Sequence, residues 1–534
     1  MIHQNSANFS LVCNQFKFDD GIINNANEML EVASLLLSLF LFGYGIRMLL
    51  FLYKSQKYHA ESTQIVHQSP PISMLKTLGM SYNSNHVTTN QNIVFRDNAR
   101  KGVLHPDIAP NYSRPNYNEF LENLDSPQLR LSSHLELESY PVVSLVIATY
   151  NEESVIENLL KSLEMLTYDR NKWEVIVVDD STDSTSRILE EWTKRMENLK
   201  IIKRSQRFGW KGGALNLALE YLRKDSAWII ILDADMILPL DIIEKFLGTL
   251  YNSKKKCNAI QGYCLPYNNY FKPKTGFSNW VSKGVEFRLA QRNMIEFVAR
   301  DKLDLPVQIT GSLFMIKSSI LKELGFSTDI CEDWDLTLQL YLRENDKIDL
   351  TDSKNNSRLC ESNILFEENL NAESQMPTSF SSYFKQRLRV SEGHTRGFIK
   401  MIPKLIKHKQ PLKNKIEIFL TGCLYLRYII FICLLILDLV TLIMFNSNIF
   451  NIYSILCLSV QLFCLISIII TNVLAVVICN KSRHYDLTFL VSKLFLDICT
   501  FPALVIGSLL AVLRKKGTFY RTERIAGNIQ ISKE

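Results

Sequence analysis

The stretch WIIILDADMILP, from Trp228 to Pro239, places five apolar residues directly before two aspartates, Asp233 and Asp235. A strand that is buried on both faces appears in a sequence as such an apolar run, so this segment is predicted to be a central strand of a parallel sheet. Because the two carboxylates lie one residue apart, a single local cap cannot satisfy both. They are therefore predicted to bind a cation at the end of the strand.

The overall composition is globular, but the apolar residues are unevenly distributed. The 534 residues allow roughly two to four domains, with 21% charged and 47% apolar residues. A net charge of +6 does not indicate a nucleic-acid partner, whereas basic clusters beside apolar stretches suit the surface of a lipid bilayer. The eleven cysteines form no CxxC pair, so they predict neither a metal finger nor a disulfide framework. No pattern specifies an oligomeric state.

Four segments are long and apolar enough to enter a bilayer: residues 31–53, 416–445, 450–479 and 487–513. Lys54 and Lys57 follow the first segment, and lysine and arginine favour the cytoplasmic side of a membrane. The middle of the chain is therefore expected in the cytoplasm. The whole is expected to be a multi-pass protein, integral to the cell membrane.

The last apolar segment carries residues that disfavour a simple crossing. Lys493 and Asp497 are costly in lipid, and Pro502 removes a helical hydrogen bond. A straight span would also place the basic tail RKKGTFYRTER outside. A broken, re-entrant hairpin over 487–513 is therefore predicted.

From residue 141 onward, strand and helix patterns alternate. The apolar runs VVSLVIATY, WEVIVVDD, LKIIKR and WIIILDAD are strand-like, and helical patterns separate them. This alternation predicts an α/β fold with a doubly wound parallel sheet. Ligands of such sheets bind at the carboxyl ends of the strands. The corresponding polar strand ends are residues 149–152, 179–181, 207–213 and 233–235.

These strand ends predict a site for a nucleotide diphosphate. Asp233 and Asp235 offer hard oxygen ligands that suit Mg²⁺ or Mn²⁺, which takes its remaining ligands from water and phosphates. The glycines of GWKGGALN allow close backbone approach at a helix N-terminus, where Lys211 adds positive charge. The sequence contains no GxxxxGK[ST] motif, and no GxGxxG follows the first strand, which excludes P-loop and dinucleotide-binding classes.

Four motifs occur in a fixed order before the C-terminal apolar segments: VVDDS, DAD, CEDWDL and QRLRV. In this order they closely resemble the processive family-2 glycosyltransferases, which include the cellulose, hyaluronan and plant mannan synthases. The resemblance runs from about residue 141 to 524. It implies a nucleotide-sugar domain of the GT-A type with transmembrane helices. It also implies inverting transfer of a sugar from a nucleotide-diphosphate sugar to a growing β-linked polysaccharide.

The resemblance also implies roles for individual residues. Asp333 would be the catalytic base, and Asp233 and Asp235 would hold the metal. The other candidate binding residues are Thr149, Tyr150, Glu152, Asp179, Asp180, Lys211, Gly311, Ser312, Glu332, Gln386, Arg387 and Arg389.

Each motif also has a purely structural interpretation. The DAD carboxylates could be solvated strand-end residues, and one aspartate of VVDDS could cap a helix. The carboxylates of CEDWDL could complement a helix dipole, and QRLRV could be a basic interfacial helix facing phospholipid. The order of the four motifs favours the functional interpretation.

One position departs from the family pattern. Val390 stands where the family has a tryptophan that stacks on the acceptor sugar, so Trp334 or Trp280 would have to supply a flat face. Without one, the alternative function is non-processive transfer of a sugar to a lipid. A catalytically inactive scaffold and a transporter are disfavoured, because the DAD and ED motifs are intact within a large nucleotide-type domain.

The predicted organisation has seven parts. They are an extracytoplasmic segment (1–30), a transmembrane helix (31–53), a linker (54–140), a cytoplasmic glycosyltransferase domain (141–395), amphipathic interfacial helices (396–415), membrane helices (416–513) and a cytoplasmic tail (514–534).

Overall fold

The computed structural model describes residues 20–67, 140–253, 255, 257–266, 276–343, 364–444, 452–480 and 484–514. The chain divides into two compact units. The larger falls within Phe51–Cys423 and Ala475–Glu534, and the smaller within Met1–Leu50 and Leu424–Leu474. Most of the predicted linker, and the predicted tail apart from its first residue, lie outside the described residues.

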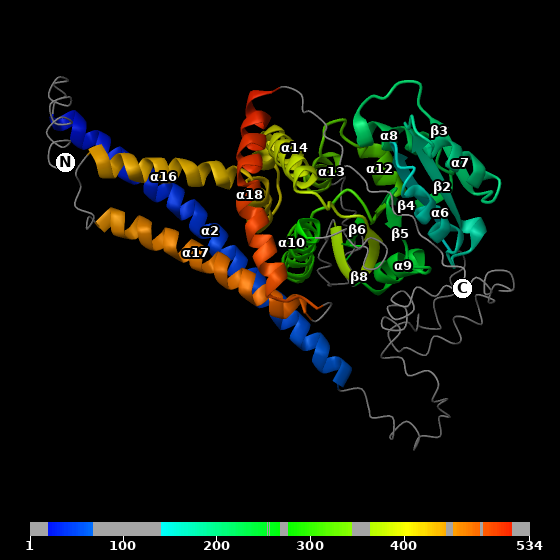
Figure 1. Cartoon of the computed structure of the whole chain (residues 1–534), viewed down its shortest axis with the longest axis horizontal. Helices are drawn as coiled ribbons and strands as arrows, with labels where there is room; N and C mark the ends of the chain where they lie inside the picture. Colours follow the sequence, from blue (N-terminus) through cyan, green and yellow to red (C-terminus); the bar gives the residue numbers. More distant parts are fainter. Residues whose placement is uncertain are drawn as a thin grey trace, which may run out of the picture. The chain divides into compact units, whose positions relative to one another are not determined.

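The larger unit contains an eight-stranded sheet in the order β3-β2-β1-β4-β7-β6-β8-β5 (Figure 1). Its strands are β1 (Val142–Thr149), β2 (Trp173–Asp179), β3 (Leu199–Lys203), β4 (Ser226–Asp233), β5 (Met236–Ile237), β6 (Ala259–Pro266), β7 (Phe314–Lys317) and β8 (Ile364–Ser374). The DAD segment ends β4, which lies between β1 and β7. Its residues 229–232 are fully buried, which confirms the predicted central strand.

The predicted α/β sheet is confirmed, and it is mixed: antiparallel pairs join the parallel ones. β3, β2, β1 and β4 run parallel, as predicted. β7 is antiparallel to both β4 and β6, and β5 is antiparallel to β8. Helices also separate the later strands, and β6 pairs with β8 in parallel, so alternation alone does not determine the direction of β7 and β5.

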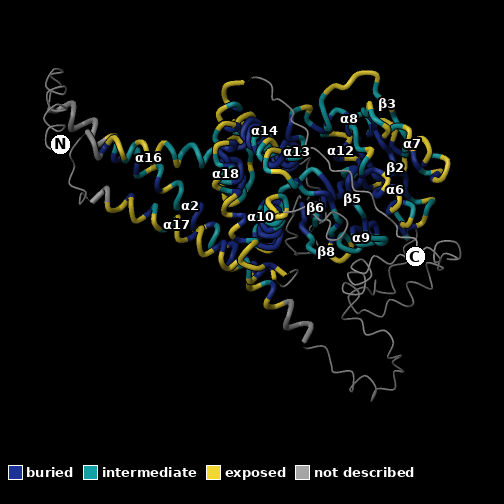
Figure 2. Tube along the Cα trace, in the orientation of Figure 1, coloured by how far each residue is buried: buried dark blue, intermediate teal, exposed yellow. Residues whose placement is uncertain are grey.

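Helices cover both faces of this sheet (Figure 1). α6 (Ile156–Glu164), α7 (Thr185–Thr193) and α9 (Ile242–Asn252) share a hydrophobic core with one face. α8 (Trp210–Glu220) and α12 (Ser318–Leu324) pack on the other. Figure 2 shows the strands buried between these layers, which explains their uninterrupted apolar sequences.

Further helices of the larger unit connect the sheet to the C-terminal region. They are α10 (Phe277–Gln291), a π-helical segment (Arg292–Phe297), α11 (Val298–Lys302), α13 (Glu332–Tyr341), α14 (Phe380–Lys407) and α15 (Leu412–Gly422). α14 continues through residue 396, so the predicted boundary between catalytic domain and interfacial helices falls inside one helix.

The last helix, α18 (Leu487–Leu513), is continuous and contains Pro502, so the predicted hairpin is wrong. Its charged residues are neutralised where it packs along α10 and α14. Asp497 forms ion pairs with Lys493 at 2.7 Å and with Arg288 of α10 at 2.6 Å. Extensive packing on two helices offsets the one hydrogen bond that Pro502 removes.

The described residues of the smaller unit form three helical segments: the first part of α2 (Asp20–His67), α16 (Leu426–Met444) and most of α17 (Ile452–Cys479). Asp438 of α16 accepts hydrogen bonds from Ser34 at 2.7 Å and from Gln461 at 2.8 Å. A carboxyl group in an apolar helix is thereby paired inside this unit.

Several of the described helices have the dimensions of a membrane span. Met29–Glu61, Ile455–Cys479 and Leu487–Leu513 are each long and apolar enough to cross a bilayer. The helices Leu412–Gly422 and Leu426–Thr441 together pass the same test but are bent by 73°. α2 continues to His67, so its end occupies the start of the predicted linker.

Candidate active site

The carboxyl ends of the parallel strands lie at one edge of the sheet. The pairing of these strands places several predicted site residues side by side at that edge. Thr149 of β1 pairs with Asp179 of β2, which pairs with Lys203 of β3. On the other side of β1, Ala148 pairs with Asp233 of β4. Two of the predicted acidic strand ends therefore lie on either side of β1.

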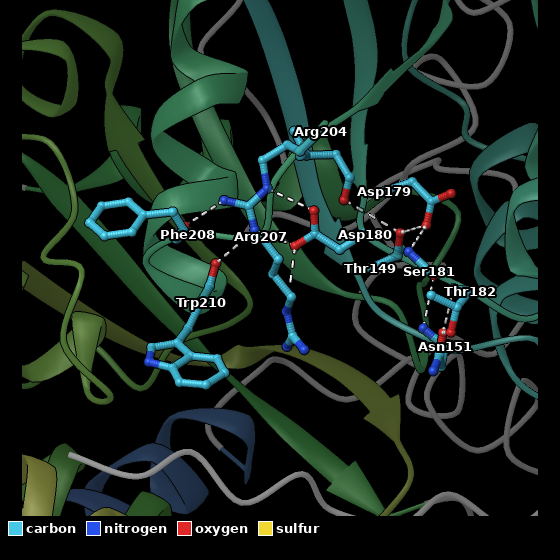
Figure 3. Close-up of polar contacts among 11 residues, drawn as sticks. Thr149, Asn151, Asp179, Asp180, Ser181, Thr182, Arg204, Arg207, Phe208 and Trp210 are labelled. Carbon is cyan, nitrogen blue, oxygen red and sulfur yellow. Dashed lines mark hydrogen bonds and ion pairs between the residues drawn. The ribbon is translucent and has the colours of Figure 1, made fainter.

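The Asp179 carboxylate is buried and organises the loop after β2 (Figure 3). Its Oδ1 accepts hydrogen bonds from the Thr149 hydroxyl and the Ser181 N–H, both at 3.0 Å. Its Oδ2 accepts a hydrogen bond from the Ser186 hydroxyl. Asp179 thus links the ends of β1 and β2 to the start of α7.

Glu152 contributes through its backbone to the same edge. Its N–H donates to the Thr185 hydroxyl at 2.9 Å, and its carbonyl accepts from the N–H groups of Val155 and Ile156 at 3.0 Å each. The first bond joins the turn after β1 to the first turn of α7, and the other two lead into α6.

Asp180 lies against Arg207, the first residue of the predicted strand end 207–213, and against Arg204, which was not predicted (Figure 3). Arg204 donates to it from Nε at 2.7 Å and also from a terminal nitrogen, while the Arg207 Nε is 3.7 Å away. The Arg207 guanidinium carbon lies 3.5 Å from the ring centroid of Tyr150 and 5.3 Å from that of Trp210. Asp180 and Tyr150 are therefore both engaged by the segment after β3.

Lys211, at the first turn of α8, connects three parts of the site. Its Nζ donates to Asp233 Oδ1 at 2.5 Å and to the Gly311 carbonyl at 2.8 Å, and lies 3.9 Å from Glu332. Burial lowers the pKa of this ammonium, but the carboxylates of Asp233 and Glu332 outweigh it and hold the pKa above its usual value. Lys211 therefore remains a cation.

Two carboxyl groups with raised pKa values begin α13. Burial, together with the charge of Asp333, raises the pKa of Glu332 to about 7, against the opposing charges of Lys211 and Arg389. Burial likewise raises the pKa of Asp333, whose Oδ1 accepts the Trp334 N–H at 2.8 Å. Carboxyl groups perturbed in this way are typical of acid–base sites.

The loop before β7 closely approaches Asp333. Gly311 has a φ of 86°, and a Cβ there would lie 3.3 Å from Asp333 Oδ2. The buried Gln261 fixes this loop, since it accepts the Thr310 N–H at 2.9 Å and donates to the Ser312 carbonyl at 3.1 Å. Gly311 thus lies beside Asp333, and Ser312 is held in the same loop by Gln261, which the sequence did not indicate.

The predicted arginines of α14 face different neighbours. Arg389 interacts electrostatically with Glu332 and Asp333. Arg387 is buried and interacts instead with His394 and with the α18 residue Asp497. Gln386 and Val390 are half-buried on the same stretch of α14. The structure therefore brings Arg389 to the carboxylates of α13 and Arg387 to His394 and Asp497.

The two candidate tryptophans differ in exposure, since Trp334 is buried and Trp280 is half-buried. Trp334 is 2% exposed and stacks on His394, with ring centroids 4.3 Å apart and planes at 13°. Trp280 packs on Phe495, with ring centroids 4.8 Å apart. The Trp334 ring is therefore covered by His394, whereas Trp280 contacts Phe495 and stays partly exposed.

The two carboxylates of the DAD motif suit a hard divalent cation whose remaining ligands come from a bound molecule. Asp235 is buried, and its Oδ2 accepts from the Ser374 hydroxyl at 2.9 Å and the Gln375 N–H at 3.0 Å, which fixes the carboxylate. Asp233 is partly exposed and lies against a cationic group, Lys211. Within the described ranges no three His, Cys, Asp or Glu side chains form a complete metal site. Two carboxylates suit Mg²⁺ or Mn²⁺ that takes further oxygens from phosphates.

The sequence of this unit matches that of known glycosyltransferases. Residues 144–325 match the family described as Glycosyl transferase family 2. A beta-monoglucosyldiacylglycerol synthase from Nostoc sp. is 41% identical over 125 residues, which are 23% of this chain and 26% of that protein. A probable glucomannan 4-beta-mannosyltransferase from Arabidopsis thaliana is 24% identical over 308 residues, 55% of this chain and 50% of that protein.

Among solved structures, a mannosyltransferase from Pyrobaculum calidifontis, in complex with GDP-Man and Mn²⁺, is similar with a TM-score of 0.46. It is 18% identical, and the match covers 71% of this chain and 89% of that one. The match to the Glycosyl transferase family 2 model extends from β1 to α12 and so includes most strands of the mixed sheet. The matches to the two relatives span half of their lengths or less.

Proposed function

We propose that the chain is an inverting hexosyltransferase that transfers a sugar from a nucleotide-diphosphate sugar to an acceptor at a membrane. The proposal rests chiefly on Lys211, which joins the strand end of Asp233 to the carboxylates that begin α13. A diphosphate beside this ammonium would have a potential base close by. A donor site and an acceptor site would then share one edge of the sheet.

The donor would extend along that edge. Thr149, Tyr150, Glu152 and Asp179 surround the place proposed for the base and ribose. The N-terminus of α8 and Lys211 would face the diphosphate, because helix N-termini and ammonium groups both attract anions. Mg²⁺ or Mn²⁺ held by Asp233 and Asp235 would supply positive charge to the departing diphosphate.

Asp333 is proposed as the base. Its carboxylate takes the proton of the acceptor hydroxyl, whose oxygen forms the new bond to the anomeric carbon as the bond to the diphosphate breaks. Burial raises the pKa of Asp333, and the charges of Lys211 and Arg389 oppose that effect. Gly311 leaves room beside Asp333 Oδ2 that any larger residue would occupy.

The acceptor is either the end of a growing β-linked polysaccharide or a lipid. A specific observation favours the lipid. A processive enzyme needs an exposed aromatic face to hold a sugar, but position 390 is valine and Trp334 is stacked on His394. The two relatives represent both possibilities, since one is named for a lipid product and the other for a polysaccharide.

The same proposal places the protein in the cell membrane with several spans and a cytoplasmic catalytic domain. The sequence on each side of α18 is basic, NKSRHYD before it and RKK after it, which favours the cytoplasm for both ends. A continuous helix with both ends on one side would lie along the bilayer surface. Its exposed side supports this, with large apolar residues such as Leu487, Ile498 and Val512.

Product analysis tests the acceptor assignment. The purified full chain, reconstituted in lipid vesicles, would be incubated with radiolabelled nucleotide sugars and Mn²⁺, and the products extracted into organic solvent or precipitated with ethanol. Label in the organic phase identifies a lipid product, and label in long precipitable chains identifies a polysaccharide. No transfer from any donor by folded protein would contradict the proposal.

A further inference from the structure

Asp180 follows β2 at the edge proposed for the donor, but its carboxylate faces protein groups. The side chains of Asp180 and Arg204 are 6% and 7% exposed, and they meet through two nitrogens of the guanidinium. Figure 3 shows the two side chains facing each other, with Arg207 on the other side of Asp180. A buried carboxylate in such a pair fixes the arginine more than it recognises a ligand.

The same guanidinium holds the turn that leads into α8. Arg204 donates to the Phe208 carbonyl at 2.7 Å and to the Trp210 carbonyl at 3.3 Å (Figure 3). Between these carbonyls Gly209 adopts a φ of 70°, which favours glycine. A Cβ on Gly213 would overlap the Phe208 carbonyl, so the turn packs directly on the first turn of α8.

The opposite side of α8 is fixed just as closely. The side-chain amide of Asn216 accepts the Phe326 N–H at 2.7 Å and donates to the Phe326 carbonyl at 2.8 Å. A Cβ on Gly212 would overlap the Ser327 carbonyl. Lys211 therefore stands on a helical turn held by the Asp180–Arg204 pair on one side and by the segment before α13 on the other.

We infer that Asp180 is a positioning residue, which acts through Arg204 to place Lys211 against the donor diphosphate. The inference rests on the proposed function, because it assigns a diphosphate to Lys211. It differs from the sequence-based prediction, in which Asp180 contacts the nucleotide directly. The two roles differ in which part of the nucleotide they affect.

Nucleotide binding separates the two roles. Calorimetric dissociation constants of the full chain would be measured with Mn²⁺ for UDP against UMP, and for GDP against GMP. Each monophosphate carries the base and ribose but lacks the second phosphate. For whichever pair the wild type binds, Asp180→Asn should weaken the diphosphate about tenfold or more and the monophosphate less than about twofold.

Two further variants sharpen the comparison. Arg204→Lys keeps the charge but loses the planar fork, so it should reproduce the loss of the diphosphate preference. Lys203→Gln is the matched control, because it removes a neighbouring cation whose pair with Glu190 is exposed, and should change neither affinity. Thermal unfolding of each variant would establish that it is folded.

The outcomes are distinguishable. If Asp180→Asn weakens diphosphate and monophosphate equally, Asp180 contacts the nucleoside and the inference is overturned. Unchanged affinities in both Asp180→Asn and Arg204→Lys would overturn it as well. If the folded wild type binds neither nucleotide pair, the proposed function itself fails.

Discussion

Replacing Asp333 with asparagine tests the proposed base with little change in shape. The amide oxygen can still accept the Trp334 N–H that now bonds to Oδ1 at 2.8 Å. The amide cannot take up a proton at neutral pH. The contacts of Lys211 with Asp233 and Gly311 do not involve Asp333, so the donor side should stay intact. The substitution therefore isolates the proton-transfer step.

The expected loss follows from general-base catalysis. A positioned base contributes about 10²- to 10⁴-fold, which corresponds to roughly 3 to 5 kcal/mol of activation free energy. We expect kcat to fall by about that factor, with the dissociation constant of the donor changed less than about threefold. Glu332→Gln is the matched comparison and should cost less, because Glu332 faces Lys211.

The pH profile provides a second criterion. Asp333 works only when ionised, and burial raises its pKa above the usual value for aspartate. The wild-type rate should therefore fall as the pH drops through that raised pKa, and the residual rate of Asp333→Asn should lack this dependence. Release of nucleoside diphosphate gives the rates, and calorimetry gives donor binding. Near-normal turnover in Asp333→Asn with none in Glu332→Gln would assign the base to Glu332 and refute this reasoning.

Three other substitutions give separate tests. Asp235→Asn should abolish turnover without unfolding the protein, because it removes charge from the proposed cation site; full wild-type activity in excess chelator would argue against a metal there. Val390→Trp should lengthen the products or block a lipid acceptor, and products of unchanged kind and length would exclude position 390 from acceptor binding. Burial and the charges of Arg300 and Arg387 lower the pKa of His394 to about 3. The imidazole is therefore protonated at a higher pH in the unfolded chain than in the folded protein. The free energy of unfolding should fall as the pH drops from about 6.5 toward 3. His394→Phe should remove about 1.4 kcal/mol of this loss per pH unit, and an unchanged pH dependence of thermal unfolding would show that His394 does not cause it.

The part of the fold that could be predicted is the part set by local pattern. The apolar run before Asp233 identifies a strand buried on both faces, and alternation with helices predicts the parallel order of β1, β2, β3 and β4. The carboxyl ends of these strands then have to meet, which brings Asp179 and Asp233 to one edge. Beyond β4 this reasoning fails, because helices still separate the later strands although β7 runs antiparallel to both β4 and β6.

The contacts that sequence alone did not predict join distant segments. The Asp180–Arg204 pair depends on the register of β2 against β3, although the basic residues directly after LKIIK were an available signal. The sequence predicted Trp334 as a possible stacking surface for a sugar. In the structure His394 of α14 stacks on its ring, a contact that the sequence does not show. The prediction of a hairpin at Pro502 did not take account of the ion pairs of Asp497 with Lys493 and Arg288. The partner on α10 cannot be identified from the pattern of one helix.

The anomeric configuration of the product tests the central claim most directly. The full chain in vesicles would receive, with Mn²⁺, each α-linked nucleotide sugar in turn, and proton NMR would identify the new glycosidic linkage. Single displacement assisted by Asp333 predicts a β-linked product and one nucleoside diphosphate released for each sugar transferred. An α-linked product, or no transfer from any donor by folded protein, would contradict the account.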